Sequence, residues 1–389
     1  MNRPRRLVAM MVAWVAFMQA GFAVSAADSR QATAQPAAAL LSQAQSEADA
    51  GHSAAARDIL IKAVAIYPTN LALQKLLGDV DYRTADYSGA AAAYQKVLAS
   101  DPANKDVHNR LGGVYAAQDK YTEAISEFRS SLPLSEGFLN LIQVYIDENK
   151  LSDLEAEERS RLMTAALEPS AHFNLGLVYY YEKKYELARE EFEQALILDP
   201  HFNDARNGVG MVYGDLGRHS DAINQYKLII AASPAYANAW INWGVELIAT
   251  SDYKTAIEKI KHGIVLKPNL AIGYDNMGVA YDYLGDFTQA VELYEHALQL
   301  DPREREAYQN LGSLYFNHNL LNLAEAAFIK GLAVAPHMSV LHFNLGIVYE
   351  QQHKYGLAVD QYKAALATAP NNVEVRQQLA GVQAKLEHQ

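Results

Sequence analysis

The 389-residue chain contains no cysteine. Disulfide bonds, thiol catalysis, iron–sulfur clusters and cysteine-ligated zinc are therefore excluded, and so is a lipid anchor attached at a cysteine. Basic residues are also few, because 33 lysines and arginines stand against 45 aspartates and glutamates, a formal net charge of −12. Such an acidic chain lacks the positive surface that binds phosphate backbones, so we expect no nucleic-acid partner.

Long apolar runs are absent after residue 26. Before it, MNRPRR supplies three arginines, an apolar run extends from Leu7 to about Val24, and the small residues of AVSA follow. This order is typical of a secretory signal peptide over residues 1–26, so we predict cleavage after Ala26 and export to the periplasm or the medium. The alternative is an inner-membrane anchor over residues 7–24, which would be the protein's only contact with the membrane.

Catalytic motifs are missing as well. The chain has no G-x-S-x-G, no H-E-x-x-H and no phosphate-binding loop, and its twelve histidines have no ligand partner at metal spacing. We therefore predict no catalytic residues, no metal and no cofactor, and we do not expect an enzyme.

What the chain does contain is a period of 34 residues that runs from Pro169 to Asn372 without insertion or deletion. A proline, a glycine and an alanine each recur at this spacing through six units, and a period of this length indicates a stacked repeat array. These residues are Pro200, Pro234, Pro268, Pro302, Pro336 and Pro370; Gly176, Gly210, Gly244, Gly278, Gly312 and Gly346; and Ala188, Ala222, Ala256, Ala290, Ala324 and Ala358.

The recurring residues of one unit form two helical stripes. When the unit is numbered 1 to 34 with the proline at position 32, the glycine is position 8, the alanine position 20, and large residues hold positions 7, 11 and 24. Positions 4, 7, 8 and 11 share one helix face, and positions 20, 24 and 27 share another. We therefore predict two antiparallel helices per unit, A and B, that approach closely at the glycine and the alanine and end at the proline.

This pattern resembles the tetratricopeptide repeat, W-x2-L-G-x2-Y…A-x3-F…P, as PSAHFNLGLVYYYEKKYELAREEFEQALILDPHF at residues 169–202 illustrates. The resemblance implies an all-α fold, a right-handed superhelical solenoid of helix-turn-helix repeats. It also implies a scaffold or adaptor for other proteins, in cell-envelope assembly, secretion, or the export of polysaccharide or pili. The family serves many functions, so the resemblance leaves the partner unnamed.

The other segments follow the same frame less regularly. Residues 27–36 are predicted to be a flexible leader, and residues 37–134 hold three units, of which the third is shortened by four residues. Residues 135–168 are a degenerate unit, interpreted either as a drifted repeat that still stacks or as a joint. Residues 169–372 form the six regular units, and residues 373–389 are predicted to be a capping helix with a polar outer face.

A line of asparagines occupies position 6 of helix A, one of the positions (2, 5, 6, 9, 12 and 13) that face the concave groove in tetratricopeptide arrays. This line is similar to the asparagine ladder of the O-linked N-acetylglucosamine transferases, where the amides bind the backbone of an extended peptide. A carboxamide suits that task because it offers two donors and an acceptor. The alternative is that these asparagines are simply solvated. The predicted ladder comprises Asn140, Asn174, Asn242, Asn276, Asn310 and Asn344, with Gly208 interrupting it.

The remaining groove positions of the six regular units carry acids and aromatic residues, and neither lysine nor arginine. We therefore predict a groove that binds extended protein segments of neutral or basic character. The alternative is a structural protein that self-associates through its repeats and has no groove ligand. The predicted groove residues besides the asparagines are Asp275, Asp282, Tyr180, Tyr283 and Phe316.

Overall fold

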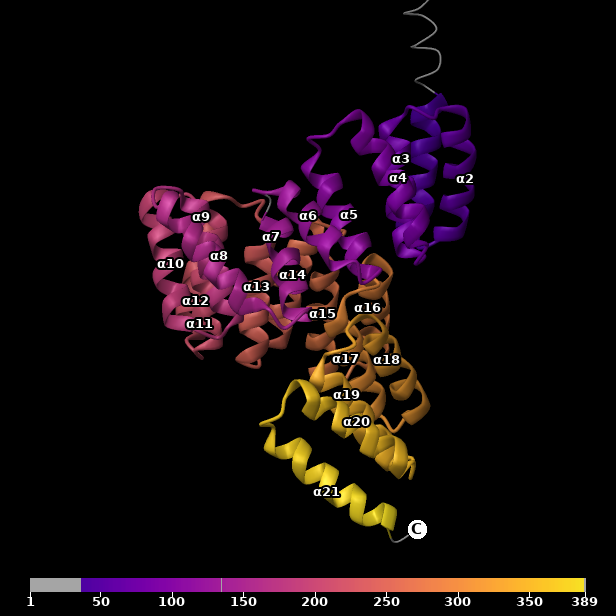
Figure 1. The fold of residues 1–389 in the computed structure, drawn as a ribbon, viewed down its shortest axis with the longest axis vertical. Coiled ribbons are helices and arrows are strands. Elements are labelled where there is room, and N and C mark those ends of the chain that lie inside the picture. The colour runs from indigo at the N-terminus through magenta and orange to yellow at the C-terminus, as the bar shows by residue number, and fades with distance from the viewer. Residues whose placement is uncertain (1–35, 134, 388–389) are drawn as a thin grey trace, which may run out of the picture. The chain divides into compact units, whose positions relative to one another are not determined.

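The computed structural model describes residues 36–133 and 135–387. The predicted signal peptide, its cleavage site and residues 27–35 of the predicted leader lie outside these residues, whereas Pro36 is already helical. Within the described ranges the chain forms helices and turns and no strand, which confirms the all-α fold (Figure 1). None of the described helices is long and apolar enough to cross a bilayer.

The helices follow one another as antiparallel pairs. Residues 36–49 form the first helix, and the others are α2 (Ser53–Ile66), α3 (Leu71–Arg83), α4 (Tyr87–Ser100), α5 (Lys105–Ala117), α6 (Tyr121–Ser131), α7 (Ser135–Asp147), α8 (Leu151–Thr164), α9 (Pro169–Tyr181), α10 (Tyr185–Leu198), α11 (Asn203–Asp215), α12 (His219–Ala232), α13 (Ala237–Ala249), α14 (Tyr253–Leu266), α15 (Ala271–Tyr283), α16 (Phe287–Leu300), α17 (Arg305–Asn317), α18 (Leu321–Val334), α19 (Ser339–Gln351), α20 (Tyr355–Thr368) and α21 (Val373–Glu387).

The six regular units have the same construction. Helix A has 13 residues and helix B has 14, from the α9 and α10 pair to the α19 and α20 pair. The turn between them always places position 15 in the left-handed region, where Gly217 and Gly285 adopt φ of 73° and 79° without strain. The structure is thus a solenoid of helix-turn-helix repeats, as predicted.

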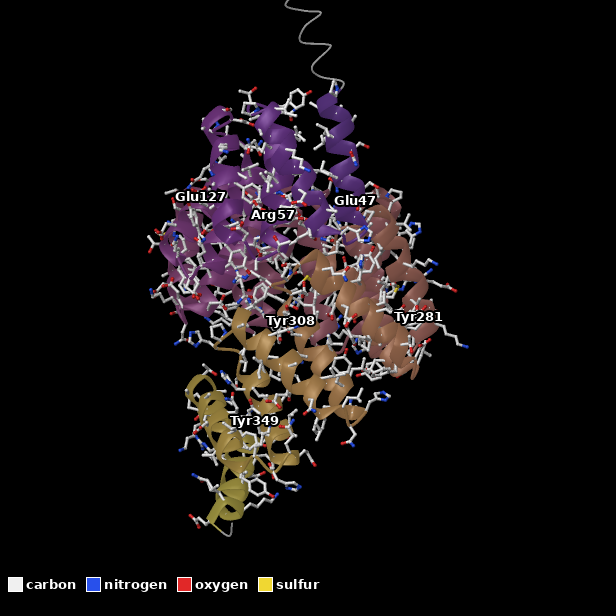
Figure 2. The ribbon with its side chains drawn as sticks, turned by 90° about the vertical axis from the view of Figure 1, so that its right-hand side faces the viewer. Glu47, Arg57, Glu127, Tyr281, Tyr308 and Tyr349 are labelled. Atoms are coloured by element: carbon white, nitrogen blue, oxygen red, sulfur yellow. The ribbon has the colours of Figure 1, made fainter. Side chains whose placement is uncertain are left out.

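The core of each regular unit forms where helix B places a large side chain on the glycine of helix A, an aromatic ring in five units and Ile260 in the unit of Gly244. A Cβ atom added to Gly176 would come within 2.7 Å of the Phe192 ring and 3.3 Å of the backbone oxygen of Ala188. On Gly346 it would meet the Tyr362 ring at 2.5 Å. The prediction that the glycine and the alanine let the two helices approach is therefore confirmed. At position 11, tyrosines such as Tyr281 and Tyr349 extend this packing (Figure 2).

The described chain consists of two compact units, one that ends at Val114 and one that starts at Tyr115, within α5. In the first unit an ion-pair network replaces the aromatic residue at position 11. Asp81 holds that position and is 2% exposed. The Nε atom of Arg57 donates to Asp81 Oδ1 at 2.5 Å, and its Nη2 donates to Asp86 Oδ2 at 2.6 Å. Because the buried carboxylate is paired, this polar position is compatible with the solenoid core.

The third and fourth repeats depart from the regular construction. Helix α6 has 11 residues and ends at Ser131, shortly before Pro133. Helices α7 and α8 make less contact with each other than the two helices of any regular unit. Helix α8 lies mainly against α9, and its buried residues are Leu154 and the charged Glu158. Whether residues 135–168 act as a joint remains a prediction.

Helix α21 covers the last helix pair. The sequence predicts that Leu379, Val382 and Leu386 cover the apolar side of α20. Val382 is buried and Leu379 is partly buried, but Leu386 is 42% exposed, and Val375 is buried in its place. Val375, Val382 and Leu386 share one face of α21 by their spacing, but Leu386 lies at the C-terminal end of the helix, one residue before it ends, and stays partly exposed there.

Deleting residues 373–389 is expected to lower the melting temperature and to promote association, because it exposes the apolar surface that Val375 and Val382 cover. Burial of these two valines contributes about 3–6 kcal/mol to the free energy of unfolding. Circular dichroism would give the melting temperature and light scattering the molar mass. The control is Leu386→Ser, which should change neither quantity appreciably. A truncated chain as stable and as monomeric as the parent would contradict the capping role.

Candidate functional site

The helices A of the second compact unit bring the predicted groove residues together. Neighbouring helices A contact one another along the series α7, α9, α11, α13, α15, α17 and α19. Position 6 therefore recurs on adjacent helices, and the asparagines form a line rather than a scatter of separate residues. What each amide can offer a ligand depends on what it already binds.

Two of the asparagines link their unit to the preceding one. Asn242 Nδ2 donates to Asn207 Oδ1 at 2.9 Å, and Asn310 Nδ2 donates to Asp275 at 3.0 Å (Oδ1) and 3.2 Å (Oδ2). In both cases the acceptor is position 5 of the helix A before. The carbonyl oxygen of each amide is not used in these bonds, so Asn242 and Asn310 retain part of their capacity.

The other asparagines differ in their surroundings. Asn276 faces Ile241 at position 5 of the preceding unit, which has no acceptor, and its Nδ2 donates instead to Ile272 O in its own helix at 2.9 Å. Asn344 is half-buried, and its side chain has no hydrogen-bond partner among residues 36–133 and 135–387. Asn140 is exposed. The side chains of Asn276 and Asn344 are the ones best placed to meet a ligand.

Asn174 and the gap at Gly208 have structural explanations. Asn174 is only 6% exposed and lies beside Glu158. Burial raises the pKa of the Glu158 carboxyl, and the amide of Asn174 lowers it. A Cβ atom on Gly208 would come within 2.8 Å of the Phe192 ring. The structure therefore places Asn174 among buried residues, and the ladder is interrupted at Gly208 because a neighbouring ring fills the space.

Among the predicted aromatic residues, Tyr283 is the most accessible. It is 64% exposed and stacks on Tyr253, with 5.2 Å between the ring centroids and 2° between the planes. Tyr180 and Phe316 are half-buried. Burial raises the pKa of Tyr180 strongly, and a hydrogen bond to Asp215 raises it further. The Tyr253–Tyr283 pair is thus a flat aromatic surface at the end of α15, suitable for packing against an apolar side chain.

Burial reduces the negative charge that the predicted acids give to the groove surface. Asp275 is 3% exposed, and burial raises its pKa to about 6. Burial also raises the pKa of Asp282, and the charge of His318 opposes this rise. Glu304 lies near Asp275, and burial together with Glu306, Asp301 and Asp275 raises its pKa to about 9. The raised pKa values of Asp275 and Glu304 favour the neutral carboxyl of each, so the surface is less negative than its composition implies.

Two cations were missed because they lie outside the predicted groove positions. Lys267 is position 31 and Arg305 is position 1 of their units. Lys267 Nζ lies 2.5 Å from Glu136 Oε1, and Arg305 Nη1 lies 3.3 Å from Asp147 Oδ1. Their partners are at positions 2 and 13 of α7, which are predicted groove positions. The only feature of the sequence that could have pointed to Arg305 is the run of charged residues DPRERE at residues 301–306.

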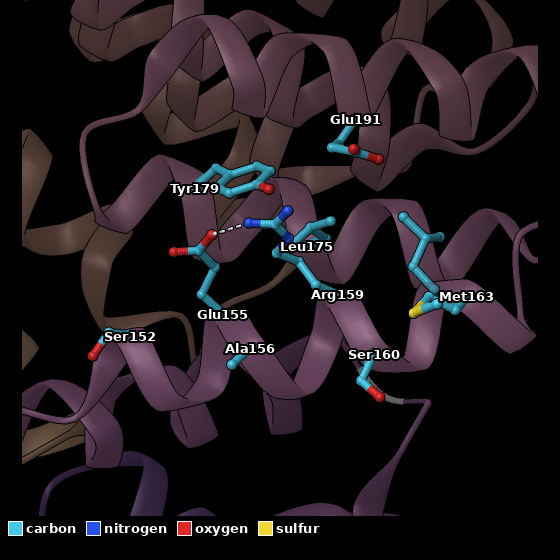
Figure 3. A pocket seen from close by; sticks show the side chains of 10 residues that line it. Ser152, Glu155, Ala156, Arg159, Ser160, Met163, Leu175, Tyr179 and Glu191 are labelled. Carbon is cyan, nitrogen blue, oxygen red and sulfur yellow. Dashed lines mark hydrogen bonds and ion pairs between the residues drawn. The ribbon is translucent and has the colours of Figure 1, made fainter.

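A second hollow lies between α8, α9 and α10, with a volume of about 830 Å³ (Figure 3). Its charged side chains are already paired, either with each other or with a residue beside the hollow. Glu155 binds Arg159 at 3.3 Å and Lys184 at 2.7 Å, and Glu191 lies 2.6 Å from His172. A ligand would have to break these pairs. No cluster of histidine, aspartate or glutamate in the described part of the chain could hold a metal ion.

Comparison with known proteins places these features in a family. Models of the tetratricopeptide repeat match residues 75–137, residues 169–202, 271–304 and 339–372, and residues 306–338. No curated protein sequence matches the chain.

Similar folds occur among solved structures. In the Cut9–Hcn1 hetero-tetramer of the APC/C, the match has 15% identity and a TM-score of 0.51 and covers 88% of this chain and 89% of that chain. A tetratricopeptide repeat protein from Parabacteroides merdae matches at 17% identity, with 63% and 98% coverage and a TM-score of 0.48. PilF of Pseudomonas aeruginosa matches at 18% identity, with 56% and 97% coverage and a TM-score of 0.43. At these identities the likeness concerns the fold alone.

Proposed function

The chain belongs to the tetratricopeptide repeat family, whose members bind other proteins, and we propose that it is an exported scaffold whose groove binds extended protein segments. The observation that carries the proposal is the line of position-6 amides on contacting helices A. Asn276, Asn310 and Asn344 occupy three successive units and keep unused hydrogen-bonding groups. Amides at this spacing can bind backbone groups of an extended segment irrespective of its sequence.

Exposed apolar side chains at other groove positions support a protein ligand. Ile272 and Val340, both at position 2, are 37% and 36% exposed, and Tyr283 at position 13 is 64% exposed. Such side chains can bury apolar residues of a bound segment while the asparagines hold its backbone. The acids of the groove, together with the absence of lysine and arginine at its predicted positions, favour neutral or basic segments.

The cellular part of the proposal rests on the sequence of residues 1–26. An exported scaffold of this kind would act in the periplasm or outside the cell, in envelope assembly, secretion, or polysaccharide or pilus export. An anchor over residues 7–24 is the alternative and would keep the same array at the inner membrane.

A second candidate function is self-association through helix B. Position 19 carries leucine in three regular units, and Leu187, Leu323 and Leu357 are 44%, 48% and 47% exposed. Repeated exposed leucines on the outer helices are suited to contacts between copies. Light scattering of the protein without residues 1–26 separates the two candidates, since a concentration-independent monomer would exclude self-association.

The groove proposal is tested by the double substitution Asn276→Ala/Asn344→Ala. Each lost hydrogen bond removes about 0.5–1.5 kcal/mol, so binding of a selected peptide should weaken by about 5- to 150-fold if the effects add. Asn310 is retained because its removal would leave the buried Asp275 carboxylate without its donor. The peptides come from a library screened against the full chain, and affinity is measured by calorimetry.

The matched control is Asn224→Ala, which removes an exposed asparagine from the outer helix α12. It should leave affinity unchanged. Equal affinities of the parent and the double variant, or selected peptides that crosslink to helices B, would refute the groove proposal and favour binding on the convex face.

A further inference from the structure

Two ion pairs join helix α7 to segments far along the chain. Lys267 Nζ binds Glu136 Oε1 at 2.5 Å across 131 residues, and Arg305 Nη1 binds Asp147 Oδ1 at 3.3 Å across 158 residues. Glu136 and Asp147 stand near opposite ends of α7. All four residues belong to the second compact unit, and the two ion pairs place the turn after α14 and the start of α17 beside α7.

These contacts fall on the groove face of α7. Glu136 and Asp147 are positions 2 and 13 of their unit, and both positions face the groove in the predicted pattern. The segment around Arg305 also acts on neighbouring aromatic residues. Burial raises the pKa of Tyr121 to about 12. The charge of Asp147 also raises this pKa, and the charge of Arg303 lowers it. Tyr181 is position 13 of the following unit. Its pKa is raised by burial and by the charge of Glu306, and the charge of Arg305 lowers it.

The charge pairs differ in exposure. The side chains of Arg305 and Asp147 are each 16% exposed, whereas those of Lys267 and Glu136 are 46% and 64% exposed. Salt screens an exposed pair much more than one that is mostly buried. Helix α7 does not pack against α15 or α17 to the extent that neighbouring helices pack in the described chain. The closure therefore depends largely on a few charged contacts, which a competing charge can replace.

We propose that the groove face of α7 is a binding surface for basic protein segments, and that Lys267 and Arg305 occupy it in cis as a latch that a ligand must displace. Lys267 and Arg305 show that Glu136 and Asp147 bind basic side chains. The latch closes the solenoid on itself between α7 and α17, so it narrows the access of an extended segment to the groove. The binding half of this inference rests on the proposed groove function, whereas the closure does not.

The closure is tested on the full chain with a water-soluble carbodiimide, which joins a carboxylate and an amine that already form an ion pair. Glu136 and Lys267 should be joined by an amide bond, with loss of water, and mass spectrometry of the digested protein should detect the linked peptides. The yield should fall by about 3-fold or more in 1 M salt, where the screening length is about 3 Å. Failure to find this link at low salt, while other ion pairs such as Lys184 and Glu155 do link, would overturn the closure.

The binding half is tested with a ten-residue peptide rich in lysine, acetylated at its N-terminus so that the side chains supply its amines. Arg305→Ala frees Asp147 from its internal cation and leaves only the neutral hydrogen bond from Gln143, so affinity for this peptide should rise by roughly 10-fold. The matched control is Lys261→Ala, which removes an exposed cation from α14 away from the latch. It changes the net charge equally and should have a much smaller effect.

A charge exchange separates closure from general electrostatics. Asp147→Arg should abolish the gain seen with Arg305→Ala and lower the yield of the carbodiimide link between residues 136 and 267, and Asp147→Arg/Arg305→Asp should restore that yield. Equal affinities of the parent and Arg305→Ala, with the link present in both, would overturn the latch while leaving groove binding intact. If the link forms but neither protein binds any peptide from the library, the groove function fails and the closure stands alone.

Discussion

Replacing Phe192 by alanine is expected to lower the free energy of unfolding by about 3–5 kcal/mol. The ring is fully buried and lies against two glycines, Gly176 of its own unit and Gly208 of the next. Because neither glycine has a side chain that could move into the vacated space, the cavity should remain largely empty. Both the hydrophobic contribution and the packing contacts are then lost.

The measurement is urea unfolding followed by circular dichroism, with the midpoint and slope compared between proteins. The control is Leu187→Ala on the same helix, whose side chain is 44% exposed and should contribute much less. In a solenoid the loss also weakens the interfaces with neighbouring units, so the transition of the variant should broaden. Equal midpoints for the two variants would show that the Phe192 ring is not the central packing element of its unit.

Replacing Asp275 by asparagine is expected to stabilise the protein at pH 7.5 by up to about 3 kcal/mol. The pKa of Asp275 is raised to about 6 in the folded chain, against 3.8 for an ordinary aspartate. A difference of about two pKa values corresponds to about 3 kcal/mol between the two protonation states. An asparagine keeps a carbonyl oxygen for Asn310 and removes the buried charge.

The pH dependence follows from the direction of this shift. Between about pH 4 and pH 6 the folded chain binds the proton that the unfolded chain releases, so stability falls as pH rises through this range. Stability should therefore be greater at pH 4 than at pH 7, as far as this group determines it. Glu304, with its pKa raised to about 9, adds a decline in the same direction at higher pH.

Denaturant unfolding of the parent and Asp275→Asn at several pH values provides the test. The two curves should coincide near pH 4, diverge between about pH 4 and pH 6 and stay apart above pH 6, with the variant more stable. Asp360→Asn, which changes an exposed carboxylate on α20, is the control and should leave the profile unchanged. A variant less stable than the parent at pH 7.5 would mean that Asn310 requires the charged acceptor, and that the buried carboxylate stabilises this unit.

The fold could be predicted because its determinants are local and repeated. Gly176 and Ala188 recur at fixed phase, and the same steric demand, a large side chain such as Phe192 packed on the glycine, produces that phase in each unit. Part of the site was accessible in the same way. Comparing position 6 with position 5 of the preceding unit distinguishes Asn310, which faces an acceptor in Asp275, from Asn276, which does not.

The remaining features could not be predicted from the pattern. The burial of Asp275 and the raised pKa of Glu304 depend on how closely two successive helix pairs pack. The contact between Arg305 and Asp147 depends on the rotation that accumulates over several units, which no residue encodes by itself. The spacing places Leu386 on the covered face of α21, but it lies at the end of the helix, and how far the preceding pair extends to cover that end cannot be read from spacing.

Because α7 and α17 are in contact, the number of units between them determines which residues meet, as the number of subunits determines the geometry of a ring. Deleting one whole unit, such as residues 271–304, would preserve every local junction, because the units have equal length and the same turn. It would nevertheless bring a different residue opposite Asp147. Gene duplication or loss should therefore be tolerated in the units after α17, whereas within the closed stretch it would alter the geometry of the opening.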